Sequence, residues 1–259
     1  MSDKLYMKCL FILIFATNLL AQVDVVFDID WTLVSQVDSY DAAGSSRVYE
    51  SLGDYYRLTD GAQEIIQDLL EDKNVRISFY SGGSEARNLD LLSQIKLSNG
   101  DSLLDISHKV LSKKHLLEVS TDESLRFSER LKKDLTLINK DLNSVVLIDD
   151  IEHFTPLNQR KNVIWTGKTF SFQDAFMHMD GEHQAKTELA WLRDRYKLYS
   201  SHSKIKSALK AVKVRNISFV DAVNRSRSYP IQSVQRLSRK FNFINRIKSS
   251  ADCFIVFGF

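Results

Sequence analysis

The sequence is poor in cysteine, proline and glycine, and these shortages exclude several classes of protein. Its 259 residues include two cysteines, two prolines and nine glycines. Two cysteines cannot build the dense disulfide framework of a small secreted scaffold. So few prolines and glycines exclude a collagen-like or low-complexity chain. The hydrophobic fraction of 44% is ample for the core of one α/β domain with an extension.

Long apolar runs are also scarce, and the run nearest the N-terminus is Cys9–Ala21. Two lysines precede it and a small residue ends it, a pattern that resembles a secretory signal peptide. It is too short for a comfortable membrane span. We therefore predict a signal peptide over 1–21 and a secreted or periplasmic mature chain without a transmembrane span. An uncleaved segment anchoring the protein in the membrane is the alternative, and the start at Met1 or Met7 stays open.

A short apolar run just after the predicted signal peptide is followed by two aspartates. Residues 23–27 are rich in β-branched side chains and are followed by Asp28, Asp30 and Thr32. Such a run predicts a buried parallel strand, whose carboxyl end is where open α/β sheets bind ligands. Side chains two residues apart on a strand point the same way. Asp28 and Asp30 could therefore share one site, where one attacks and the other handles protons.

Two further predicted strands also end in polar residues. A strand over 75–80 precedes Ser81 and two glycines, and a strand over 144–148 precedes the acid pair Asp149–Asp150. Between them, Lys132-Lys133-Asp134 opens a predicted helical stretch. Strands alternating with helices imply βαβ units and a parallel sheet. Helices are also predicted over 61–71 and 85–96, a short strand at 110–111 and a last strand over 163–165.

This order of acid pair, hydroxyl, lysine and acid pair resembles the haloacid dehalogenase (HAD) superfamily of aspartate-nucleophile phosphotransferases. The closer resemblance is to its C-terminal-domain phosphatase branch, the NLI-interacting-factor or FCP/SCP-like group. The segment from Tyr56, reading Tyr-Arg-Leu-Thr-Asp-Gly-Ala-Gln-Glu-Ile-Ile, is similar to one block of that group. The segment 131–150 is similar to another, with no gap between its lysine and its acid pair. The resemblance covers about residues 23–170.

The resemblance implies an α/β fold, in which a Rossmann-like parallel sheet is flanked by helices. Only 50 residues lie between Asp30 and Ser81, which leaves room for a small cap or none. The polar stretch 35–55 is predicted to form a loop or small flap, so the site should be open to bulky substrates. We divide the chain into the signal peptide, a HAD-like phosphatase domain over 22–183 and a basic, mainly helical extension over 184–259.

The resemblance also implies catalytic roles. Asp28 would be the nucleophile that forms an aspartyl-phosphate. Asp30 would protonate the leaving oxygen and then activate water. Lys133 would neutralise the phosphorylated site and hold Asp28, with Lys132 as the alternative.

Three further residues would bind the phosphoryl group. Ser81 would hydrogen-bond a phosphoryl oxygen, and Gly82 would let the backbone approach closely. Thr32 would orient the phosphate-binding loop. The six histidines show no metal-ligand spacing, so we assign them no role.

Carboxylates and a phosphate dianion need a cation between them, and Mg²⁺ prefers such oxygen ligands. We predict Asp28, the backbone carbonyl of Asp30 and the pair Asp149–Asp150 as its ligands. The family pattern favours Asp150 for direct coordination, and the residues alone leave the choice open. Two departures from the family, Trp31 and the sequence 151–153 after the acid pair, concern substrate specificity more than chemistry.

The C-terminal part is strongly basic. Residues 184–250 hold 16 Lys/Arg and 3 Asp/Glu, with apolar residues at helical spacing. We predict amphipathic helices whose basic face attracts polyanions, and for an exported protein an anionic envelope surface rather than nucleic acid. The alternative is a solvated face on helices that pack against the sheet.

The sequence thus predicts a Mg²⁺-dependent phosphatase that hydrolyses phosphomonoesters on a small molecule or a protein. Two other classes compete with it: a non-catalytic HAD-like binding module, and an envelope- or polyanion-binding protein that acts through the basic tail.

Overall fold

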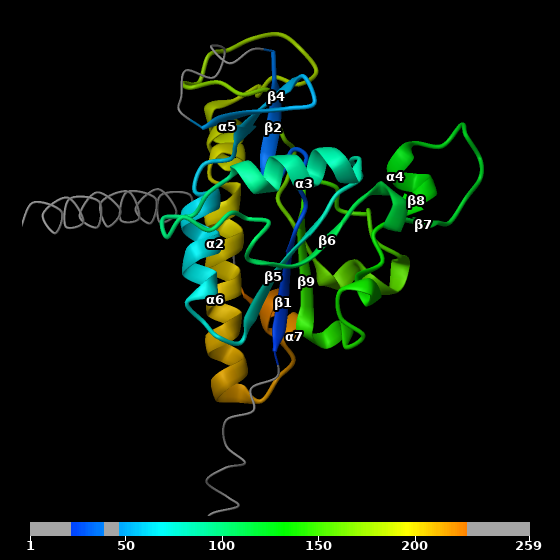
Figure 1. Cartoon of the computed structure of the whole chain (residues 1–259), viewed down its shortest axis with the longest axis vertical. Coiled ribbons are helices and arrows are strands. Elements are labelled where there is room, and N and C mark those ends of the chain that lie inside the picture. Colours follow the sequence, from blue (N-terminus) through cyan, green and yellow to red (C-terminus); the bar gives the residue numbers. More distant parts are fainter. Residues whose placement is uncertain (1–21, 39–46, 227–259) are drawn as a thin grey trace, which may run out of the picture.

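The computed structural model describes residues 22–38 and 47–226, built around a five-stranded parallel sheet (Figure 1). The strand order is β10-β9-β1-β5-β6. Its strands are β1 (Val23–Phe27), β5 (Val75–Tyr80), β6 (Ser107–Leu111), β9 (Val145–Asp149) and β10 (Val163–Trp165). The predicted parallel α/β sheet is confirmed, with β5 and β10 at their predicted bounds.

Strand β1 lies in the middle of the sheet and is buried on both faces. All five of its residues are buried, as expected for a central parallel strand. Val25 and Phe27 face the larger core cluster, and Val26 faces a smaller one on the other side. This placement brings the end of β1 between the ends of β5 and β9.

Helices cover one face of the sheet. They are α2 (Ala62–Leu70), α3 (Glu85–Gln94), α6 (Lys197–Arg215) and α7 (Phe219–Arg225), and Figure 1 shows α2 and α6 side by side. Their apolar residues join the larger core cluster with the inward side chains of β1. The helices predicted over 61–71 and 85–96 are thus confirmed, with slightly shorter bounds.

The opposite face is covered by short segments, and here one prediction is wrong. Lys132 does not open a helical stretch but is the last residue of β8 (Leu131–Lys132). Strand β8 follows the one-turn helix α4 (Phe127–Arg130) and pairs with β7 (Leu117–Glu118). Asp134 then caps a 3₁₀ turn by accepting a hydrogen bond from the Thr136 amide. This local hydrogen bond competes with a regular helix.

A small antiparallel sheet forms the flap predicted between the first acid pair and Ser81. Its strands are β2 (Val34–Val37), β3 (Val48–Ser51) and β4 (Asp54–Leu58), in the order β2-β4-β3. Leu52 and Gly53 make the β3–β4 turn with φ of 52° and 88°, the left-handed geometry that two-residue hairpins favour. In the described part of the chain, the helices and strands that lie between β1 and β5 in sequence are those of the flap and α2.

The C-terminal helices are part of the main core. After α5 (Glu188–Arg195), helix α6 buries Leu198 and Tyr199, and α7 buries Phe219 and Val220 in the larger cluster. A Cβ on Gly61, which has φ of 81°, would lie 2.4 Å from the Tyr199 ring, so the close approach of α6 requires glycine there. The described part of the extension therefore forms helices that pack against the sheet.

The predicted signal peptide and the residues after 226, including the apolar run 253–259, lie outside the described residues. No helix in the described ranges is both long enough and apolar enough to cross a bilayer. Export and attraction to an envelope surface stay predictions, and N-terminal sequencing of the native protein tests the first. A native chain that begins at Met1 or Met7 would contradict it.

An ion pair between α2 and α6 leads to a first prediction. The Asp68 carboxylate lies 2.7 Å from His202 Nε2 and 2.8 Å from Lys206 Nζ. Hydrogen bonding from His202 lowers the pKa of Asp68 to about 2, against the effect of burial and with help from Lys206. Stability from a depressed carboxyl pKa is present above the unfolded value and lost as pH falls through the folded one.

Asp68→Asn is therefore expected to lower the free energy of unfolding by about 2 kcal/mol at neutral pH. The difference from wild type should vanish as the pH falls from about 4 to about 2. Urea unfolding across this range measures it, with Glu71→Gln, an exposed carboxylate at the end of α2, as the control. An Asp68→Asn penalty that stays constant down to pH 2 would rule out this ion-pair origin.

Candidate active site

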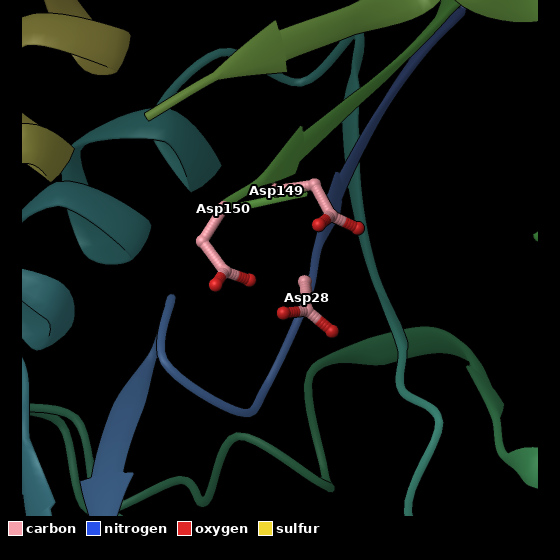
Figure 2. A group of neighbouring side chains, drawn as sticks. All are labelled: Asp28, Asp149 and Asp150. Carbon is pink, nitrogen blue, oxygen red and sulfur yellow. The ribbon is translucent and has the colours of Figure 1, made fainter. Parts of the chain in front are cut away.

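Three acidic side chains meet where β1 and β9 end. Asp28 directly follows β1, Asp149 is the last residue of β9 and Asp150 comes next. One carboxylate oxygen from each lies within 4.8 Å of the others. Figure 2 shows Asp149 and Asp150 reaching from the end of β9 toward Asp28. The sequence prediction that these residues lie together follows from the meeting of parallel strand ends at one edge of the sheet.

Lys133 lies between two of these three side chains, Asp28 and Asp149. Its ammonium is 2.5 Å from Asp28 Oδ1 and 2.7 Å from Asp149 Oδ2, and the side chain is fully buried. Burial disfavours its charge, but Asp149 and Asp28 raise the pKa of Lys133 above its usual range. Lys132 instead donates to the carbonyls of Ser128 and His153. The structure thus brings Lys133, and not Lys132, to Asp28.

The cluster carries more negative than positive charge. Burial raises the pKa of Asp28 well above its usual value, and Asp149, Asp150 and Asp30 add to the shift while Lys133 opposes it. Burial and the adjacent Asp149 also raise the pKa of Asp150 to about 6. Three carboxylates beside one ammonium fit a hard divalent cation, which would satisfy the surplus of charge with oxygen ligands.

The two acids of the β9 pair have different partners. Asp149 receives Lys133 on one oxygen and the amide of Ile151, at 2.7 Å, on the other. No side chain of the described residues hydrogen-bonds to the Asp150 carboxylate. The Asp150 amide donates to the hydroxyl of the buried Thr32 at 3.1 Å. Asp150 therefore has the carboxylate that is available for a ligand, and Thr32 braces the loop that carries it.

Asp30 has a partner that sequence reasoning missed. Arg87 binds both of its carboxylate oxygens, through Nη1 to Oδ1 and at 2.6 Å through Nη2 to Oδ2. Ser81 donates its hydroxyl to the same carboxylate at 2.8 Å. The hydrogen bonds and charge of Arg87, with Ser81, outweigh burial and lower the pKa of Asp30. The sequence signal for this contact was the position of Arg87, four residues before Leu91, which puts both on the buried face of α3.

The glycines after β5 make room for this arrangement. A Cβ on Gly83 would lie 1.7 Å from Arg87 Nη2, so a side chain there would displace the arginine. A Cβ on Gly82 would lie 2.9 Å from the Phe127 ring. Both glycines therefore allow close packing after β5, and the approach of the Gly82 backbone to a phosphoryl group stays a prediction. Ser81, expected to bind a phosphoryl oxygen, lies beside Asp30 at the same edge of the sheet.

Comparison with known proteins gives a match to one family and similarity to solved structures. The family described as NLI interacting factor-like phosphatase matches residues 24–175. No curated protein sequence matches the chain. The chain is similar to a structure of the fission yeast RNA polymerase II CTD phosphatase Fcp1, an arginine-to-alanine variant bound to beryllium fluoride. The TM-score is 0.39 at 15% identity, over 97% of this chain and 69% of that one. A second structure, of Fcp1 described as an essential RNA polymerase II CTD phosphatase, gives 0.40 at 16% identity, over 92% and 66%.

Proposed function

The chain belongs to the NLI interacting factor-like phosphatase family of the HAD superfamily, and on that premise we propose that it hydrolyses phosphomonoesters through an aspartyl-phosphate on Asp28. Membership of the family makes it a phosphoric monoester hydrolase. The observation that supports the finer mechanism is the buried ammonium of Lys133, which lies between Asp28 and Asp149 where the strands end. The substrate class is a phosphate ester on a small molecule or a protein.

In the first half-reaction Asp28 is the nucleophile. Its carboxylate oxygen forms a bond to phosphorus, while the bond from phosphorus to the leaving oxygen breaks. The leaving oxygen takes a proton from the carboxyl group of Asp30. Because the Arg87 contact favours the charged form of Asp30, this carboxyl group must release that contact to carry the proton. Lys133 neutralises the negative charge at Asp28. The Ser81 hydroxyl, which donates to Asp30 in this structure, would turn to donate to a phosphoryl oxygen of the bound substrate.

In the second half-reaction water attacks the aspartyl-phosphate. The Asp30 carboxylate takes a proton from the water, whose oxygen bonds to phosphorus while the bond to Asp28 breaks. Inorganic phosphate leaves, and both carboxyl groups return to their starting states. The bidentate contact with Arg87 favours the Asp30 carboxylate, the charged form that acts as the base in this step.

We further propose that Mg²⁺ belongs to this site, held by Asp28, the backbone carbonyl of Asp30 and Asp150. Asp149 is the weaker candidate for direct coordination because Lys133 and the Ile151 amide already occupy its oxygens. When bound, the cation supplies positive charge for the phosphoryl oxygens. Hydrolysis of an aryl phosphate, such as p-nitrophenyl phosphate, with added Mg²⁺ and with a chelator tests the proposal. A folded protein without turnover would instead support the non-catalytic binding module.

A second prediction separates the role of Asp30 from that of Asp28. Asp30→Asn is expected to slow hydrolysis of alkyl phosphates by about 10²- to 10⁴-fold, the usual contribution of a positioned acid or base. Formation of the aspartyl-phosphate from an aryl phosphate should suffer less, because a good leaving group needs no proton. Single-turnover rates for the two ester types measure this. Equal losses for both would remove Asp30 from the role of general acid.

The same variant also tests the metal assignment. Asp30 is proposed to meet Mg²⁺ through its backbone carbonyl, so Asp30→Asn should leave the Mg²⁺ affinity nearly unchanged. Titration of the variant with Mg²⁺, followed by thermal shift, measures that affinity without turnover. A large loss of affinity would show that the Asp30 side chain is a ligand.

A further inference from the structure

The loop Asp28–Thr32, called the catalytic loop below, contains a residue with an unusual backbone conformation. Trp31 has φ of 61°, in the left-handed region that residues with a Cβ rarely adopt. Within the described ranges, Leu52 and Asn216 are the other non-glycine residues with positive φ, and they lie in a hairpin turn and at the end of α6. Trp31 differs from them because it lies between Asp30 and Thr32, inside the proposed active site. Such a conformation persists only when surrounding groups hold it.

Three contacts hold Trp31 in place. Its amide donates to the carbonyl of Val34 at 2.7 Å, and its ring stacks on His183 with centroids 6.3 Å apart and planes 18° apart. Its carbonyl accepts a hydrogen bond from the ammonium of Lys197. The first contact is made within the loop itself. The other two come from the part of the chain that follows the family match, which ends at residue 175.

Lys197 is well placed to fix the loop. Its side chain is 2% exposed, and its ammonium also pairs with Asp194 Oδ1 at 2.9 Å. It is the first residue of α6, and its neighbours Leu198 and Tyr199 are buried in the main core. The lysine therefore has little freedom to move. Burial of an ammonium group costs free energy unless the group is paired and hydrogen-bonded. The hydrogen bond from Lys197 to the Trp31 carbonyl is therefore part of what stabilises this buried charge.

We propose that Lys197 is a positioning residue, which holds the Trp31 carbonyl and with it the Asp28–Thr32 loop in the geometry for phosphoryl transfer. The catalytic unit then extends beyond the family match into the C-terminal helices. This inference rests on the proposed function, because the loop carries the proposed nucleophile and general acid. It assigns Lys197 no contact with the substrate.

The first test compares Lys197→Met with two variants of the same helix. Lys197→Met should lower kcat for an aryl phosphate by about 10- to 100-fold, the scale of a small displacement of reacting groups, with little change in KM. Lys206→Met removes a lysine that pairs with Asp68 away from the loop. Ile205→Val trims a buried side chain of α6 without touching the loop. Both control variants should keep kcat within about twofold when folded.

The second test asks whether Lys197 acts through Trp31. Glycine adopts positive φ without strain, so Trp31→Gly should remove the need for the lysine at this position. In the Trp31→Gly background, Lys197→Met should cost several-fold less kcat than it does in wild type, a non-additive result. A Lys197→Met penalty that is unchanged by Trp31→Gly would overturn the proposal. If Lys197→Met is insoluble, a soluble and active double variant supports the proposal, and an insoluble one contradicts it.

A measurement without turnover separates this inference from the proposed function. Mg²⁺ should raise the melting temperature of the wild-type protein, because the loop supplies two of its proposed ligands. Lys197→Met should reduce that shift, and Ile205→Val should preserve it. Wild-type protein without phosphatase activity would contradict the proposed function alone. Full kcat and a full Mg²⁺ shift in folded Lys197→Met would contradict the role of Lys197 alone.

Discussion

Asp28→Asn is expected to abolish phosphatase turnover, with a loss on the order of 10⁶-fold, as when other covalent nucleophiles are removed. An amide at this position can lie where the carboxylate lies but cannot form an acyl phosphate. Asp28 accepts the Lys133 ammonium at 2.5 Å, and asparagine keeps an oxygen that can accept it. The loss should therefore be chemical, with the fold intact.

Stability gives the control for this variant. Burial and the neighbouring carboxylates raise the pKa of Asp28, which means that its charge is unfavourable in the folded protein at neutral pH without a cation. A group with a raised carboxyl pKa destabilises the fold above that pKa, so asparagine should leave the melting temperature unchanged or higher in the absence of Mg²⁺. Asp122→Asn, in an exposed turn, is the matched substitution for activity. Turnover retained in Asp28→Asn would remove Asp28 from the role of nucleophile.

Lys133→Met is expected to be the most destabilising single change in the site. It would leave Asp28 and Asp149 facing each other in a buried place without their shared cation. Removing one partner of a buried ion pair costs about 3–5 kcal/mol. Turnover should also be lost, because no ammonium would neutralise the phosphorylated site. Denaturant unfolding and an aryl phosphate assay measure the two effects.

Lys132→Met is the matched control, since it changes the adjacent lysine in the same way. Lys132 donates to two backbone carbonyls and reaches no carboxylate of the site. Its loss should cost no more than about 1 to 2 kcal/mol and should leave turnover intact. The Lys133→Met penalty should also shrink in acid, because burial raises the pKa of Asp28 and its protonation removes one of the two unpaired charges. Equal penalties for the two lysines would refute the position assigned to Lys133 between Asp28 and Asp149.

Much of the site could be predicted because parallel strands end at one edge of a sheet. The apolar runs predict β1, β5 and β9. Because these strands are parallel neighbours, the polar residues that follow them lie at the same edge of the sheet. This argument depends only on local sequence and on the pairing of neighbouring strands. It predicts that Asp28, Ser81 and Asp149–Asp150 lie at the same edge of the sheet.

The side chains that reach the site from helices could not be predicted in this way. Arg87 follows Ser81 by six residues, and its bidentate contact with Asp30 depends on how α3 packs. Lys197 is one of many lysines in a basic stretch, and only the docking of α6 sets it apart. The spacing from Arg87 to Leu91 indicates only that Arg87 faces the core, and not which carboxylate it meets. Lys197 has no local pattern that separates it from a solvated lysine on a helix.

The charge of the C-terminal part was similarly hard to interpret from a count. Lys206 pairs with Asp68 at 2.8 Å, and Lys213 pairs with Asp72 at 2.9 Å, both acids of the α2 region. Some of the positive charge of α6 is therefore paired with acidic residues in and after α2. A count of charges cannot show which of them meet a partner after folding. Attraction of residues 184–259 to an anionic surface stays a prediction.

The most direct test of the account is to identify the phosphorylated residue. Wild-type protein is mixed with an aryl phosphate and Mg²⁺, quenched in the first turnovers and reduced with borohydride, which converts an aspartyl-phosphate to homoserine. Peptide mass spectrometry should then find homoserine at position 28 in wild type and none in Asp28→Asn. Turnover by the wild-type protein without homoserine at position 28, or with the phosphoryl group on another residue, would contradict the account.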